Sequence, residues 1–227
     1  MESMMKHVRQ PPLRIGHRGA AGHAPENTLL SIETALSFGA EVIEIDVHRS
    51  RDGQLIVMHD ERVDRTTNGS GYIRDLTLAQ LRALEVPTLA QAIQAVKGRA
   101  ALMVELKVRH IVPEVVRAVA NVPDVSVFYA SFFHSELLRV RELEPGARTI
   151  ALLEAVPVSL TAFAIDAQAT HAGVAFQSLE PDFVRALQDA GLAVFTYTVD
   201  DPEEIRYARS LGVDGLISNF PDRLLQA

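Results

Sequence analysis

The chain has 227 residues, of which 48% are hydrophobic, and a formal net charge of −7, which is the composition of a folded protein with a large core. It contains no Cys, so disulfide frameworks, thiolate zinc sites, iron–sulfur clusters and cysteine nucleophiles are excluded. The acidic balance argues against binding of nucleic acid or of an anionic membrane, because both require a surplus of Lys and Arg. The net negative charge is still compatible with a small anionic ligand, since a local positive patch is sufficient to bind one.

The N-terminal residues 1–12 contain basic side chains but no apolar region followed by small residues, so they do not match a secretory signal and we expect a cytoplasmic protein. The longest apolar stretch, residues 149–164, is interrupted by Glu154 and Pro157 and falls short of the roughly 20 residues that span a bilayer. We therefore expect no stable membrane insertion. No linker or charge block divides the chain, which predicts one domain over residues 1–227.

Short β-rich runs alternate with helical patterns along the whole chain. The predicted strands are residues 13–16, 42–47, 101–106, 125–130, 149–153, 173–176, 193–199 and 213–217. The predicted helices are residues 28–38, 89–96, 111–120, 135–143, 160–171, 182–190 and 202–211. Such alternation predicts parallel β-α-β units, and eight of them in about 225 residues match a closed (β/α)8 TIM barrel. A doubly wound open sheet is the alternative fold, although its G-x-G-x-x-G fingerprint is missing.

The predicted strand at residues 42–47 carries its charges on one face. Side chains alternate along a strand, so Glu44, Asp46 and His48 share one side. The same alternation in the strand at residues 101–106 directs Glu105 and Lys107 toward the barrel axis. Both groups lie at C-terminal strand ends, which is the rim where barrel enzymes build their active sites.

Three carboxylates on one rim form an oxygen site that suits a hard divalent cation. Glu44, Asp46 and Glu105 favour Mg²⁺ or Ca²⁺, with Mn²⁺ also suitable, and no organic cofactor is indicated. The alternative is a salt-bridge network of the same carboxylates with Lys107, because ion-pair networks also gather on barrel rims. Strand position alone does not distinguish the two.

An Asp-Gly turn follows the charged strand and predicts a short hairpin and loop insertion. If Asp52-Gly53 is a two-residue turn, paired residue numbers sum to 105 and His59 stands opposite Asp46, whereas a bulge would shift this register by one. The literal register brings His59 and Asp60 beside the carboxylates. Residues 65–71 are expected to form a mobile, Gly-rich loop at the mouth of the site.

The first strand ends in Gly16-His17-Arg18-Gly19, where glycines flank a His-Arg pair. His17 can exchange a proton near neutral pH, and the rigid fork of Arg18 matches phosphate oxygens. Such a turn alone is weak support for a site. The stronger indication is the convergence on one rim, from three neighbouring strands, of His17, Arg18, Glu44, Asp46, His59, Glu105 and Lys107.

In their order and spacing these motifs resemble the glycerophosphodiester phosphodiesterase family, and the resemblance covers residues 15–221. The motifs are His17-Arg18-Gly19, Pro25-Glu26-Asn27-Thr28, Glu44-Ile45-Asp46, His59-Asp60, Pro87-Thr88-Leu89, Glu105-Leu106-Lys107 and Asp214-Gly215. The resemblance implies a TIM barrel that hydrolyses small glycerophosphodiesters to glycerol 3-phosphate and an alcohol with a divalent cation. It implies the metal ligands Glu44, Asp46 and Glu105, the phosphate contacts Arg18 and Lys107, the general base His17 and the general acid His59.

Two departures from the family pattern limit what the resemblance implies about specificity. Tyr197 stands where many relatives have Trp, so it would form a slimmer wall near the glycerol or alcohol group. The 27 residues between His59 and Pro87 are fewer than in the insertion of many relatives.

A lysophospholipase D or another phosphodiesterase on the same site is the enzyme alternative, which a broad apolar groove would favour. A noncatalytic barrel that binds anionic metabolites is the alternative of another class, and the oligomeric state is left open.

Overall fold

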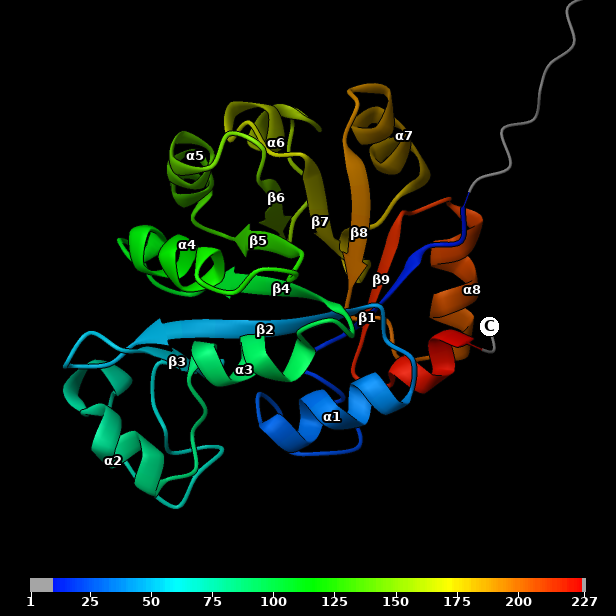
Figure 1. Cartoon of the computed structure of the whole chain (residues 1–227). Helices are drawn as coiled ribbons and strands as arrows, with labels where there is room; N and C mark the ends of the chain where they lie inside the picture. The colour runs from blue at the N-terminus through cyan, green and yellow to red at the C-terminus, as the bar shows by residue number, and fades with distance from the viewer. Residues whose placement is uncertain (1–9, 226–227) are drawn as a thin grey trace, which may run out of the picture.

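The computed structural model describes residues 10–225. The prediction that residues 1–12 are not a secretory signal therefore concerns, for residues 1–9, a segment outside the described residues. Within the described residues, eight parallel strands close into a barrel in the order β1-β2-β4-β5-β6-β7-β8-β9, because β9 pairs with β1 (Figure 1). They are β1 (Leu13–Gly16), β2 (Val42–Arg49), β4 (Ala101–Leu106), β5 (Val127–Ser131), β6 (Arg148–Leu153), β7 (His171–Ala175), β8 (Ala193–Tyr197) and β9 (Gly215–Ser218). The predicted TIM barrel is confirmed, and the open-sheet alternative is wrong.

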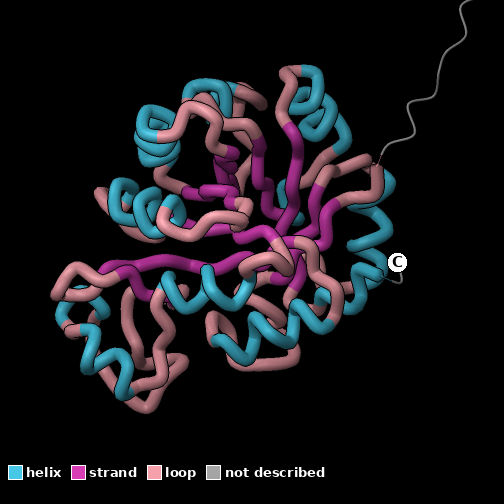
Figure 2. The backbone as a smooth tube through the Cα atoms, viewed as in Figure 1, coloured by secondary structure: helices cyan, strands magenta, loops and turns pink. Residues whose placement is uncertain are grey.

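Helices between the strands surround the barrel (Figure 2). They are α1 (Leu29–Ser37), α3 (Leu89–Val96), α4 (Val112–Ala120), α5 (His134–Leu143), α6 (Ala162–Asp166), α7 (Pro181–Asp189) and α8 (Pro202–Ser210). Their apolar faces pack on the outward side chains of the strands in two buried clusters. A third cluster, which includes Ile15, Met103, Phe128 and Phe195, fills the barrel interior. Most of the side chains that fill the barrel interior are apolar, so the carboxylates of β2 and β4 that point inward differ from the rest of the interior.

The helix predicted at residues 160–171 is much shorter in the structure. α6 ends at Asp166, and His171 already begins β7. The side chain of Thr170 accounts for the early strand, because its Oγ1 donates to the carbonyl of Thr149 and accepts from the Thr149 N–H, both at 2.9 Å. These bonds attach the segment to β6 before the helix can continue.

The hairpin after β2 differs from its predicted register by one residue. β3 (Leu55–Val57) pairs antiparallel with β2, and the pair His48↔Ile56 sums to 104 rather than 105. The cause is a longer turn: the N–H of Ser50 donates to the carbonyl of Gln54 at 2.9 Å, and Gly53 adopts a left-handed φ of 80° between them. Met58, not His59, therefore bonds to the backbone of Asp46.

A further helix, α2 (Leu78–Ala83), lies in the insertion and was not predicted. β3 lies along the last residues of β2, and α2 projects from the same side of the barrel (Figure 1). Thr77 and Gln80 form a capping box at its start, in which each side chain bonds to the other's backbone N–H. This pattern in the sequence is a recognised helix-start signal, so α2 was predictable.

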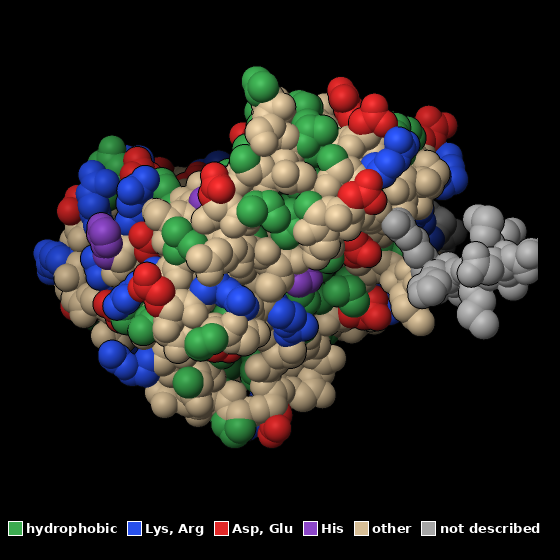
Figure 3. Space-filling model, turned by 90° about the horizontal axis from the view of Figure 1, so that it is seen from above, with side chains coloured by type: hydrophobic (Ala, Val, Ile, Leu, Met, Phe, Trp, Pro, Cys, Tyr) green, Lys and Arg blue, Asp and Glu red, His purple; other side chains and the backbone are tan. Residues whose placement is uncertain are grey.

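The surface in Figure 3 carries charges of both signs, with Lys and Arg side chains next to Asp and Glu side chains rather than in one continuous basic stripe. Between residues 10 and 225, no helix combines the length and the apolar character needed to cross a bilayer.

Gly19 holds the loop after β1 closely against α1. Its φ is +83°, and a Cβ there would collide with the side chain and backbone of Ser31. We expect Gly19→Ala to lower the free energy of unfolding by more than about 1 kcal/mol, because the new side chain is strained by both the backbone angle and the clash. Urea denaturation followed by circular dichroism measures this change. Gly146→Ala is the matched control, since a Cβ there would meet no atom within 4 Å; an equal loss in both variants would contradict the explanation.

Candidate active site

The turn after β1 places His17 and Arg18 at the C-terminal rim of the barrel. The N–H of His17 donates to the carbonyl of Ser218 at 2.8 Å, which fixes the start of the turn against β9. Arg18 then adopts a left-handed φ of 50°, and its N–H donates to Oε2 of Glu44 at 2.8 Å. The hydroxyl of Ser31 donates to the Arg18 carbonyl at 2.5 Å. The backbone of Arg18 is thus bonded to β2 and to α1, and its side chain contacts Glu26 and Asp46.

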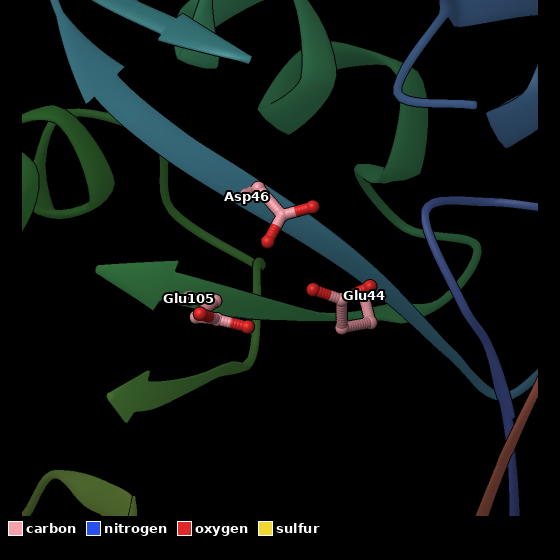
Figure 4. A group of neighbouring side chains, drawn as sticks. All are labelled: Glu44, Asp46 and Glu105. Atoms are coloured by element: carbon pink, nitrogen blue, oxygen red, sulfur yellow. The ribbon is translucent and has the colours of Figure 1, made fainter. Parts of the chain in front are cut away.

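Three carboxylates converge between two neighbouring strands. Glu44 and Asp46 extend from β2 and Glu105 from β4, and their side chains point toward one another (Figure 4). The strand register sets Asp46 directly beside Glu105. One oxygen from each carboxylate lies within 4.8 Å of the other two. The alternation of side chains in the sequence predicted this shared face.

Two cationic side chains contact the carboxylates, so part of the predicted salt-bridge network is present. Nζ of Lys107 is 2.8 Å from Oε1 of Glu105 and 3.4 Å from Oδ1 of Asp46. Nε of Arg18 is 3.5 Å from Oδ2 of Asp46. Among residues 10–225, however, no Lys or Arg side chain forms an ion pair with Glu44. Of the three acids in this network, Glu44 therefore has no Lys or Arg side chain as an ion-pair partner.

The pKa shifts of the three acids follow from this arrangement. Burial, followed by the charges of Asp46 and Glu105, raises the pKa of Glu44 well above its usual range. Burial and Asp46 raise the pKa of Glu105 to about 7, although Lys107 opposes the shift. Burial would also raise the pKa of Asp46, but Lys107 and Arg18 outweigh it and lower that pKa. Fully ionised, the three acids would carry one more negative charge than Arg18 and Lys107 neutralise, and their all-oxygen donor set fits a divalent cation, which would favour that ionised form.

These shifts predict how stability depends on pH when no cation is bound. Glu44 and Glu105 have folded-state pKa values above the ordinary 4.5, so their contribution to stability is complete below pH 4.5 and is lost as pH rises through these raised values, which for Glu105 is about 7. We expect the free energy of unfolding in chelator, taken as the difference between the unaltered protein and Glu44→Gln, to fall between pH 5 and about 7.5; the lowered pKa values of His17, His48 and His171 act in the opposite direction and are common to both proteins. We expect saturating Ca²⁺ to stabilise the unaltered protein more as pH rises. Urea denaturation at constant ionic strength measures both. A stabilisation by Ca²⁺ that does not vary with pH would argue against cation binding at these acids.

His17 faces the carboxylates from the turn after β1. Its Nε2 is 4.0 Å from Oε2 of Glu44, and its Nδ1 is 2.8 Å from Oδ1 of Asn219. Burial, and then the charge of Arg18, lowers the pKa of His17, so the ring is neutral near pH 7. A neutral imidazole can accept a proton.

His59 lies in the insertion just after β3, and its neighbours fix both its backbone and its ring. Nδ1 of His59 is 2.7 Å from Oδ1 of Asp60, and Nε2 of His48 donates to the carbonyl of His59 at 3.0 Å. Arg65 bonds to both Asp60 and Glu26, which connects the insertion to the loop after β1. Arg65, the largest influence, and His59 hold the pKa of Asp60 well below its usual range. The segment expected to be a mobile loop is therefore anchored at its first residue.

Tyr197 forms a wall of the small pocket beside Glu44 and Glu105. This pocket at the barrel mouth is lined by His17, Glu44, Met103, Glu105, Leu152, Tyr197 and Ile217. The ring of Tyr197 meets the ring of Phe132 edge to face, with centroids 6.3 Å apart. The pocket thus has His17 and two carboxylates on one part of its lining and mostly apolar side chains, with Tyr197, on the rest.

The structure adds residues at this site to which sequence reasoning gave no role. Nδ2 of Asn27 donates to Oδ2 of Asp46 at 2.8 Å, and Oδ1 of Asn27 accepts the Asp46 N–H at 3.2 Å. Asn27 is buried with a left-handed φ of 57°, a conformation that Asn tolerates better than most residues. Its place directly before a helix start was a usable signal. Glu26 and Arg65, which meet across 39 residues of sequence, gave no such signal.

Comparison with known proteins agrees with this geometry. The sequence model of the Glycerophosphoryl diester phosphodiesterase family matches residues 17–223. A glycerophosphodiester phosphodiesterase of Bacillus subtilis is 32% identical over 246 residues, covering 92% of this chain and 84% of the relative. The structure of an Oleispira antarctica phosphodiesterase in complex with the product sn-glycerol-3-phosphate superimposes with a TM-score of 0.86 at 27% identity, covering 94% and 95% of the two chains. A glycerophosphodiester phosphodiesterase of Agrobacterium tumefaciens gives 0.83 at 28%, covering 94% and 99%.

The barrel, its acidic rim and these relatives define the class of protein as a phosphoric diester hydrolase built on a (β/α)8 barrel. The chain belongs to the glycerophosphoryl diester phosphodiesterase family, as the order of its motifs predicted.

Proposed function

We propose that the protein hydrolyses glycerophosphodiesters to glycerol 3-phosphate and an alcohol with the help of one divalent cation. The observation that carries this proposal is the convergence of three carboxylates, two of them buried and the third half-buried, with two cationic side chains at one barrel rim. The Oleispira antarctica relative, which binds sn-glycerol-3-phosphate, supports the choice of substrate class. The match over residues 17–223 supports treating residues 1–227 as one catalytic domain. The cytoplasmic location stays a prediction from the sequence.

Glu44, Asp46 and Glu105 would hold the cation, because they provide only oxygen ligands and share one small space. When bound, Mg²⁺, Ca²⁺ or Mn²⁺ supplies Lewis-acid polarisation of a non-bridging phosphate oxygen. No organic cofactor is part of the proposal, since proton transfer and charge stabilisation are sufficient for hydrolysis.

Arg18 and Lys107 bind the phosphate and stabilise the charge that develops on its oxygens. Nε of Arg18 lies 3.5 Å from Oδ2 of Asp46, and Nζ of Lys107 lies 3.4 Å from Oδ1 of the same carboxylate. With three carboxylates and one dication, these two side chains leave a nominal net charge of +1. This charge complements a phosphodiester, which carries one negative charge.

His17 removes the proton from the nucleophile, and His59 protonates the leaving alcohol oxygen. The nucleophile is either water, which gives glycerol 3-phosphate directly, or the neighbouring glycerol hydroxyl, which gives a cyclic phosphate that a water must then open to glycerol 3-phosphate. In both cases the proton of the nucleophile passes to His17 as the new P–O bond forms. The P–O bond to the alcohol then breaks, and its oxygen takes a proton from His59. Burial of His17 supports the role of base, and the bond between Asp60 and Nδ1 of His59 orients the second ring.

Cleavage of lysophospholipids on the same site is the second candidate function. Phe132 is 40% exposed and packs against Tyr197 at the mouth, which provides apolar surface for an alcohol larger than a small head group. A noncatalytic metabolite-binding barrel would leave both histidines and all three carboxylates without a role.

A product assay separates these functions. Purified protein with Mg²⁺ or Ca²⁺ is incubated with glycerophosphocholine, glycerophosphoethanolamine and lysophosphatidylcholine, with and without excess chelator. We expect glycerol 3-phosphate from the first two substrates and no product in chelator. Faster release of lysophosphatidic acid from the third would favour the second candidate. Binding without any product would contradict both enzymatic proposals.

A further inference from the structure

A chain of hydrogen bonds leads from His17 away from the carboxylates. Nδ1 of His17 is 2.8 Å from Oδ1 of Asn219, and Nδ2 of Asn219 donates to Oδ2 of Asp200 at 2.7 Å. Asn219 follows β9, and Asp200 lies beyond the end of β8. Since β1, β9 and β8 are adjacent in the barrel, this chain connects the ends of three neighbouring strands.

Asp200 is held in place by donors on both of its oxygens. In addition to the amide of Asn219 on Oδ2, its Oδ1 accepts the Asn219 N–H at 2.8 Å and the Ser218 hydroxyl at 2.9 Å. Nη1 of Arg223 donates to the Asp200 carbonyl at 2.6 Å. The carboxylate therefore has a defined orientation, and its position does not depend on His17.

The orientation of Asp200 determines which nitrogen of His17 carries the hydrogen. An ionised carboxylate only accepts hydrogen bonds, so the Asn219 amide must present Nδ2 to Asp200 and Oδ1 to His17. A carbonyl oxygen also only accepts, so Nδ1 of His17 must donate. In the neutral ring, Nε2 then carries the lone pair, and Nε2 is the nitrogen that faces Glu44.

We propose that Asp200, acting through Asn219, is a positioning residue that fixes His17 as the Nδ1–H tautomer and keeps Nε2 available to accept a proton. This inference rests on the proposed role of His17 as general base. It assigns a function in turnover to a residue that touches neither the substrate nor the carboxylate cluster. A purely structural role for Asp200 would require only that the ends of β8 and β9 stay together.

Asp200→Asn tests the inference with almost no change in shape. The variant keeps Oδ1 for the Ser218 hydroxyl and the Asn219 N–H, but it turns an NH₂ group toward Nδ2 of Asn219. Two donors then face each other, so the Asn219 amide turns over and presents its NH₂ group to Nδ1 of His17. We expect the hydrogen of His17 to move to Nε2, which ¹⁵N NMR of labelled imidazole detects. We expect kcat to fall by about 10²-fold with little change in KM, because the lone pair no longer faces the substrate.

The double variant D200N/N219D is the rescue. It exchanges the amide and the carboxylate, so the carboxylate at position 219 accepts from both His17 Nδ1 and the new amide. We expect the Nδ1–H tautomer and most of the lost kcat to return. Asp201→Asn is the matched control, because Asp201 is the next residue and accepts from the N–H of Glu203 at the start of α8, away from His17. It should change neither the tautomer nor kcat.

The NMR signal and the rate separate failure of this inference from failure of the proposed function. If Asp200→Asn leaves the hydrogen on Nδ1, the inference is overturned whatever happens to kcat. If the tautomer changes and kcat does not, Asp200 does position His17, and the proposed role of His17 as general base is wrong.

Discussion

Replacing His17 or His59 by Ala is expected to lower kcat on glycerophosphocholine by about 10²- to 10⁴-fold each, because each variant loses one proton transfer. Binding of the cation and of the substrate should persist, since neither ring is among the proposed ligands. Steady-state kinetics and calorimetric titration with Ca²⁺ measure the two effects. His23→Ala is the control, because His23 lies in the same loop as His17 but pairs with Asp222 at the surface.

A substrate with a better leaving group distinguishes the two histidines. A phosphodiester of nitrophenol needs little protonation as the phenolate departs, so His59→Ala should regain much of its lost rate on it. His17→Ala should not, because the nucleophile must still lose its proton. The reverse pattern would exchange the two roles. Rates near wild type for both variants on glycerophosphocholine would rule out the two-histidine mechanism.

Glu44→Gln is expected to lower kcat/KM by about 10³-fold, which corresponds to losing the several kcal/mol that a bound cation contributes to the transition state. The half-saturating cation concentration should rise. Stability in chelator should not fall, because the variant replaces a buried acid that lacks a cationic side chain with a neutral amide of the same shape. Kinetics against Mg²⁺ concentration and urea denaturation measure these effects.

Glu41→Gln controls for a general effect of removing an acid near β2. Glu41 precedes the same strand and pairs with Arg14 at the opposite end of the barrel. It should leave the response to the cation unchanged. Full activity of Glu44→Gln, or of the unaltered protein in excess chelator, would remove the cation from the mechanism.

The carboxylate cluster was predictable because its cause is local. Side chains alternate along a strand, so Glu44 and Asp46 had to share a face, and the barrel topology had to set β4 beside β2. The helix and strand pattern likewise depends on periodicity within short windows. For these reasons the sequence was sufficient for the barrel and for the shared face of its acids.

The hairpin register and the polar contacts around the histidines could not be predicted from the periodicity of short segments. One extra residue in the turn at Gly53 moved His59 out of register with Asp46, and residue spacing does not specify turn length. Asn219 meets His17 across 202 positions because the last strand closes on the first. No periodicity predicts which side chain completes such a contact.

The central claim is that Glu44, Asp46 and Glu105 jointly bind one divalent cation beside His17. Anomalous diffraction from crystals soaked in Mn²⁺ tests it most directly, because Mn²⁺ suits the same oxygen ligands and its position can be located from its own scattering. We predict a single strong peak at about 2.0–2.6 Å from oxygens of all three carboxylates. A peak that contacts none of them, or no peak at a Mn²⁺ concentration that supports full turnover, would contradict the account.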